Sequence, residues 1–102
     1  MSKKNNSIIT QIGTSNDTVI VGGIWKMYET HGLPLDAIFI LCMEKNWIPC
    51  WLTLYNDMLA SGMKHGRIIS KLEESISDSF GKQFCDVVIV RLNNTFTTQE
   101  KQ

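Results

Sequence analysis

The most apolar stretch of the chain, AIFILCM at residues 37–43, limits the folds that this sequence can adopt. Pro34 precedes it, Asp36 is well placed for the positive end of a helix dipole, and the polar residues EKN follow it. The segment LPLDAIFILCMEKN therefore predicts a helix that is apolar on every face and has to be covered by the rest of the chain. We expect this helix to be the central element of the fold.

Length and charge further limit the number of domains and the kinds of partner that this chain can have. The 102 residues suffice for one domain with a single core, and we expect flexible ends near residues 1–6 and 94–102. Ten basic and ten acidic side chains cancel, which removes the general attraction to nucleic acid or anionic lipid that a basic protein has. The first residues contain no apolar signal core and no apolar run is long enough to span a bilayer, so we expect no membrane contact and a cytoplasmic location.

Helical periodicity extends over most of the chain between residues 24 and 80. A first helix begins at Ile24 and stops at Gly32, and it is followed by the apolar helix described above. Residues 46–48 form a tight turn, after which further helices are expected at about residues 50–60 and 64–80.

Short β-branched runs flank these helices. SIITQI and TVIVGG, separated by turn-forming residues, predict a hairpin with strands near residues 7–12 and 18–22. FCDVVIVRL predicts a further strand near residues 84–92, whose continuous apolar run we expect to be covered on both sides, with self-association as one means of covering it. The predicted fold class is α+β: a three- or four-helix bundle with a small antiparallel sheet built from the N-terminal hairpin and the C-terminal strand.

The residues that could carry chemistry form no recognisable catalytic or metal-binding motif. Cys42, Cys50 and Cys85 have no CxxC spacing and are expected to be buried, reduced thiols, and His31 and His65 show no paired spacing with them. The segment VIVGGIW lacks the remaining glycines of a dinucleotide fingerprint and the lysine of a P-loop. No nucleophile or orienting acid is tied to either histidine by a local motif. We therefore predict no enzyme, no metal and no cofactor.

Three large aromatic side chains follow one another at helical spacing. Trp47, Trp51 and Tyr55 lie at i, i+4 and i+8, and a second apolar stripe runs beside them, so the helix is apolar over more than one face. Two interpretations remain open. The aromatic side chains either fill the core of a small domain or anchor a protein interface, in which Trp and Tyr are favoured. On the second interpretation the candidate partner-binding residues are Trp47, Ile48, Trp51, Leu54 and Tyr55.

The order helix, tight turn, helix also invites comparison with a DNA-binding helix-turn-helix. The second helix offers only Asn56 to read a base, and Asp57 would repel phosphate. Basic residues are found instead on the next helix, where Lys64, Arg67 and Lys71 share a face at i, i+3 and i+7. A nucleic-acid-binding regulator that uses these three residues is the alternative function.

One family resembles this order of residues. IWKMYETHGLPLDAIFILCMEKNWIP, followed about twenty residues later by IISKLEESI, resembles the late-transcription coactivator of T4-type bacteriophages over about residues 24–77. The resemblance implies a small viral regulator of transcription that binds host RNA polymerase at its β-flap, on part of the surface that a σ factor would use, in the host cytoplasm. The family is expected to end in an acidic and hydrophobic segment that docks on the phage sliding clamp, whereas this chain ends NNTFTTQEKQ. The residues that carry the resemblance are Ile24, Lys26, Met27, Glu29, Gly32, Ala37, Glu44, Asn46, Ile48, Pro49, Ile69 and Lys71.

The expected function is therefore that of a small non-enzymatic adaptor that acts by binding a protein, with RNA polymerase as the partner that the resemblance implies. Nucleic acid is not expected to be the primary partner. A homo-oligomeric structural protein, a homodimer for example, is a further alternative.

Overall fold

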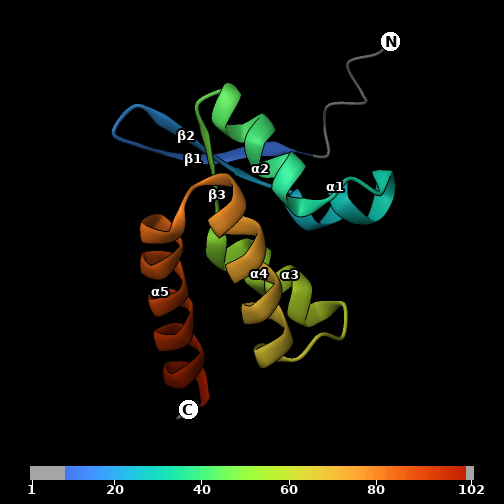
Figure 1. Cartoon of the computed structure of the whole chain (residues 1–102), viewed down its shortest axis with the longest axis vertical. Coiled ribbons are helices and arrows are strands. Elements are labelled where there is room, and N and C mark those ends of the chain that lie inside the picture. Colours follow the sequence, from blue (N-terminus) through green and yellow to red (C-terminus); the bar gives the residue numbers. More distant parts are fainter. Residues whose placement is uncertain (1–8, 101–102) are drawn as a thin grey trace.

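The computed structural model describes residues 9–100, and it describes side chains as far as residue 95. The fold is α+β, and Figure 1 shows a small sheet at one end of the molecule and helices packed against and below it. The described residues form five helices and three strands: β1 (Thr10–Ser15), β2 (Thr18–Gly22), α1 (Ile24–His31), α2 (Leu35–Glu44), β3 (Trp47–Pro49), α3 (Trp51–Ala60), α4 (His65–Ser79) and α5 (Lys82–Glu100).

The sheet has the strand order β1-β2-β3 and is mixed rather than antiparallel. The predicted N-terminal hairpin is present as β1 and β2, which pair antiparallel around a two-residue turn in which Asn16 and Asp17 both have positive φ. The first strand was predicted near residues 7–12, whereas β1 continues to Ser15; residues 7–8 lie outside the described residues. The third strand is β3, which pairs parallel to β2, with Val19 opposite Trp47 and Ile20 opposite Ile48. Of the turn predicted at residues 46–48, Asn46 lies in a turn with φ 61, whereas Trp47 and Ile48 belong to β3. Such a short strand is defined by its pairing with β2 and has no periodicity of its own.

Local signals set the ends of the helices as the sequence predicted. Gly32 adopts φ 70 and donates its N–H to Tyr28 O at 2.9 Å, which closes α1 in a conformation that glycine adopts without strain. Pro34 precedes the first turn of α2, and Asp36 lies in that turn. Gly81, with φ 99, separates α4 from α5.

Helix α2 is only partly enclosed, although its sequence predicted burial on every side. Leu35, Ile38, Phe39 and Cys42 are buried, whereas Ile40 and Met43 are each 46% exposed. The helix packs against α1, α4 and β3, and its remaining face is open.

The C-terminal segment is a helix, so the predicted strand at residues 84–92 was wrong. Cys85, Val88, Ile89 and Leu92 are buried and recur at i, i+3, i+4 and i+7, which is the spacing of one helix face. Val87 points to solvent and is 64% exposed, so the run is not covered on both sides as expected. Packing against α4 selects the helical period over the β propensity of the valines. The predicted flexible end at 1–6 lies outside the described residues, while residues 94–100 continue α5.

One hydrophobic core joins the sheet to the helices. Figure 1 shows α4 and α5 side by side and antiparallel, joined by the short turn near Gly81. The largest side chains that are fully enclosed include Tyr55, Phe39 and Ile24, from α3, α2 and α1. Between residues 9 and 100, no helix combines the length and the apolar character needed to cross a membrane.

Candidate functional site

The predicted partner-binding residues separate into core and surface. Leu54 and Tyr55 are 1% and 0% exposed, so both side chains pack in the core and cannot contact a partner. Trp51 is 8% exposed and its indole lies 5.4 Å from the Phe39 ring, measured between centroids, in an edge-to-face arrangement. Most of the aromatic stripe is therefore core.

Trp47 and Ile48 belong to β3 rather than to the helix, and both are half-buried. Because successive side chains in a strand point to opposite faces, they do not act as one surface. Lys45 Nζ lies 5.6 Å from the centroid of the Trp47 ring, and Trp47 packs along the margin of the core. Ile48 instead lines a groove of about 410 Å³ together with Trp51.

This groove, which we call the β3–α5 groove, lies between the β3–α3 segment and α5. Its walls combine side chains from β3, α3 and α5, chiefly Ile48, Trp51, Leu52, Phe84, Arg91 and Leu92. Leu52 is 43% exposed, and Ile48 and Phe84 are half-buried, so the groove presents apolar surface to its open side. Arg91 is the one charged side chain among the described residues that line it.

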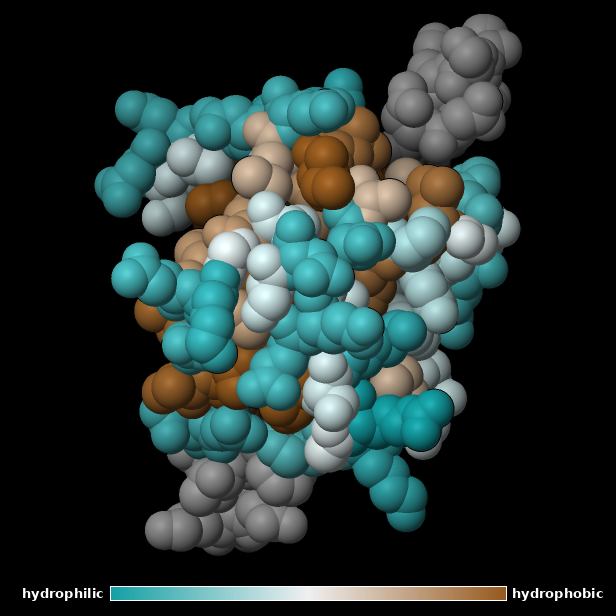
Figure 2. Space-filling view, viewed as in Figure 1, coloured by the Kyte–Doolittle hydropathy of each residue, from teal (hydrophilic) through white to brown (hydrophobic). Residues whose placement is uncertain are grey.

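Apolar surface continues along α5 beyond the groove. Val87 and Val90 are 64% and 59% exposed on the outer side of the helix. Figure 2 shows hydrophobic residues reaching the surface along the flank that α5 forms. Val87 lies at i+3 from Phe84 and at i−4 from Arg91, so it borders the groove wall on its own helix. Val90 follows Val87 at i+3, farther round the helix from the groove.

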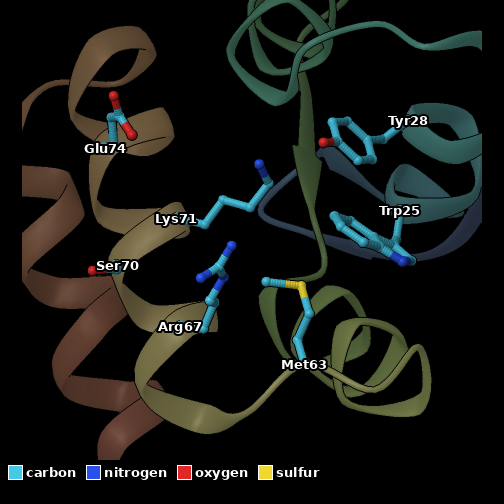
Figure 3. Close-up of a pocket in the computed structure, with 7 residues that line it drawn as sticks. All are labelled: Trp25, Tyr28, Met63, Arg67, Ser70, Lys71 and Glu74. Carbon is cyan, nitrogen blue, oxygen red and sulfur yellow. The ribbon is translucent and has the colours of Figure 1, made fainter.

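The basic residues of the nucleic-acid alternative also separate. Arg67 and Lys71 line a pocket of about 570 Å³ between α1 and α4, together with Trp25, Tyr28 and Met63. Lys64 does not line this pocket; it is exposed at the start of α4. Figure 3 shows the Arg67 and Lys71 side chains entering the same space, which faces the aromatic pair of α1. Trp25 and Tyr28 could not be connected with the basic residues from the sequence. Helices α1 and α4 are about forty residues apart, so no local spacing relates the two sets of residues.

Outside these two pockets, a chain of polar contacts links three helices. The Tyr55 hydroxyl lies 2.7 Å from His65 Nδ1, and His65 Nε2 lies 2.8 Å from Asn93 Oδ1, which ties together α3, α4 and α5. Burial raises the pKa of Tyr55 above its usual value of 10.0, and it raises the pKa of the Cys42 thiol from 9.0 to about 11.

The cysteines are free thiols, as expected, with Cys42 and Cys85 buried and Cys50 only partly so, at the end of the groove nearest α3. Within the described part of the chain, no group of three or more His, Cys, Asp or Glu side chains is placed to hold a metal ion.

Comparisons of this chain with protein-family models, with curated proteins and with solved structures found no match.

Proposed function

We propose that this protein is a non-enzymatic adaptor that holds a short apolar segment of a partner protein in the β3–α5 groove. The observation that carries the proposal is the groove itself, where large apolar side chains remain partly exposed beside a cavity of about 410 Å³. Covering such surface is favourable, at roughly 25 cal/mol for each Å² removed from water.

The lining of the groove specifies the chemistry of the partner. Large apolar anchors would contact Leu52 and Phe84, as interface anchors usually occupy partly formed pockets. A carboxylate beside those anchors would meet Arg91, whose guanidinium suits bidentate pairing. The partner segment is therefore apolar with a flanking Asp or Glu, and the exposed Val87 and Val90 would extend its contact along α5.

RNA polymerase is the first partner to test. The resemblance to the coactivator of T4-type bacteriophages implies binding at the polymerase β-flap, and a viral protein of this kind would act in the host cytoplasm. Two residues of the resemblance, Ile48 and Pro49, line the groove, which supports a docking role for this face.

The test is the affinity of purified bacterial RNA polymerase for groove variants. Leu52→Asp places a charge on the apolar wall, and we expect it to weaken binding by at least about thirtyfold, the effect of losing one hot spot of about 2 kcal/mol. Ile40→Asp is the matched control, because Ile40 is 46% exposed on α2 and does not line the groove. Equal affinities for Leu52→Asp and the unmodified protein, with both folded, would reject the groove as the binding surface.

A homo-oligomer is a second candidate, and the exposed pair Val87 and Val90 is the observation that favours it. In that case the same face of α5 would meet its copy in a second chain. Sedimentation at about 100 μM distinguishes the two, since an interface of standard size should form well below that concentration. A monomer at that concentration leaves α5 available to another protein.

A further inference from the structure

The pocket between α1 and α4 holds two cationic side chains that lack an acidic partner. Arg67 and Lys71 lie at i and i+4 on α4, where like charges repel each other. Among the described residues, neither side chain forms an ion pair, and the one interaction of Lys71 is with a ring, since its Nζ lies 5.0 Å from the centroid of Tyr28. A bound anion would remove the repulsion.

A third polar group faces the same space. Figure 3 shows the Tyr28 hydroxyl and the Lys71 ammonium directed toward each other across the pocket, with the Arg67 guanidinium below them. The described residues give the Tyr28 hydroxyl no hydrogen-bond partner. The carboxylate of Glu74 is directed away from the cations in the same view. Two cations and a hydroxyl therefore enter one pocket from two helices, which suits a dianion with several acceptor oxygens.

The aromatic walls do not suit a run of stacked bases. Trp25 is 8% exposed and stacks on Tyr28, with 4.6 Å between ring centroids and 19° between the planes. Lys71 Nζ also lies over the Tyr28 ring. Binding of single strands depends on a series of free aromatic faces for successive bases, and a single stacked pair does not provide such a series. The net charge of zero and the absence of Lys64 from the lining also disfavour an extended polyanion.

The pocket is larger than an inorganic ion requires. Its volume of about 570 Å³ lies in the range of small-molecule sites, and Trp25 and Met63 supply apolar surface beside the cations. We propose that the α1–α4 pocket binds a phosphate monoester of a small organic molecule, with the phosphate held by Arg67, Lys71 and the Tyr28 hydroxyl and the organic part resting on Trp25 and Met63. The site shares no lining residue with the β3–α5 groove, so it is independent of the adaptor function.

The test follows the Met63 methyl resonance while phenyl phosphate is added to the full chain. We expect a saturable shift, and Arg67→Gln and Lys71→Gln should each weaken binding by about tenfold, because each removes a charge-assisted hydrogen bond. Lys64→Gln is the matched control and should change the affinity by less than about twofold, as it removes a neighbouring charge that does not line the pocket. Melting curves should show that the three variants stay folded, since all three positions are exposed or half-exposed.

Inorganic phosphate and benzoate, added in place of phenyl phosphate, show which part of the ligand the pocket recognises. Weaker binding of inorganic phosphate and of benzoate than of phenyl phosphate supports a monoester dianion. Inorganic phosphate that binds as tightly as phenyl phosphate would overturn the role of the apolar wall, and equal binding by benzoate would overturn the dianion. The whole proposal is rejected if phenyl phosphate leaves the Met63 signal unmoved. A single-stranded oligonucleotide that binds more tightly, and that loses affinity with Lys64→Gln as well, would reject it in favour of nucleic acid.

Discussion

At the scale of single residues, Trp51 joins the core to the β3–α5 groove. Its ring meets those of Phe39, Phe80 and Phe84 edge to face or nearly so, with centroids 5.4, 5.7 and 5.8 Å away, and only its margin reaches the groove. Edge-to-face pairs of this kind add to the stabilisation from burial itself. Trp51 therefore positions the groove wall while it fills the core.

Replacing Trp51 with Ala should lower the free energy of unfolding by roughly 3 to 5 kcal/mol, the usual cost of deleting a buried Trp. Trp47→Ala is the comparison, and it should cost clearly less because Trp47 is half-buried on β3. Urea unfolding of the two variants measures the difference. Equal losses would mean that Trp47 carries as much of the core as Trp51 does.

The buried Cys42 thiol and Tyr55 phenol make the stability of the protein depend on pH. The pKa of Cys42 is raised from 9.0 to about 11 by burial, and that of Tyr55 is raised above 10.0 by the same cause. Both groups are held neutral in the folded chain and ionise more readily when it unfolds. Their contribution to stability is thus complete below pH 9 and is lost as the pH rises through the folded values.

We expect the free energy of unfolding to fall between pH 9 and 11, by roughly 2 to 3 kcal/mol from Cys42 alone, because burial raises its pKa from 9.0 to about 11. Urea midpoints across this range measure the fall. Cys42→Ala is the control: it lowers stability at every pH but should flatten the curve between pH 9 and 11. A curve of unchanged steepness in that variant would assign the effect to other groups.

At the scale of elements, the architecture depends on whether the C-terminal segment forms a strand or the helix α5. Its apolar residues satisfy both a strand pattern, in which every member of the run is covered, and a helix pattern, in which one face is covered. The helix buries Cys85, Val88 and Leu92 against α4 and leaves Val87 in water. From the sequence alone, the β propensity of valine and isoleucine favours a strand, but tertiary packing overrides such propensities.

Two neighbouring valines test this assignment. Val88→Asp should destabilise the protein strongly, because Val88 is 3% exposed and the aspartate would be buried without a partner. Val87→Asp should change stability by less than about 0.5 kcal/mol, since Val87 is 64% exposed. Thermal melting of both variants measures the contrast. Similar, large losses in the two would favour the strand that is covered on both sides.

The remaining elements show which signals a sequence carries. Local signals predicted the ends of most helices and the presence of the hairpin, because these depend on local backbone conformation: Gly32 ends α1, Pro34 and Pro49 precede α2 and α3, and Asn16 and Asp17 form the hairpin turn. The strand β3 depends on a partner at residues 19–21, far along the chain, and three residues show no period of two. The open face of α2 likewise depends on how many neighbours reach it, which composition does not state.

At the scale of the whole molecule, the two candidate sites arise where segments distant in sequence meet. Ile48 and Trp51 were predicted as contacts, and they line the groove, but Phe84 and Arg91 were hidden in the segment taken for a strand. Arg67 and Lys71 were predicted as a basic face, but the aromatic residues that complete their pocket come from α1. Some residues of each site could be predicted from the sequence. Which segments come together to form each site depends on the fold.

The β3–α5 groove, which we propose as the surface that holds the partner, contains a cysteine to which a probe can be attached. Cys50 lines the groove and is half-buried, while Cys42 and Cys85 are 0% and 2% exposed. A thiol-reactive photo-cross-linker added to the native protein should therefore modify Cys50 first, and Cys50→Ser should take up little of it. The Leu52→Asp and Ile40→Asp variants provide the groove and control surfaces.

The most direct measurement is cross-linking of this labelled protein to RNA polymerase, followed by identification of the joined polymerase peptide. We predict a cross-link to an apolar segment with a flanking carboxylate, lost with Leu52→Asp and kept with Ile40→Asp. Polymerase that binds the labelled protein but forms no cross-link from Cys50, and that binds Leu52→Asp with unchanged affinity, would contradict the claim and place the docking surface elsewhere. Polymerase that does not bind at all would reject it as the partner.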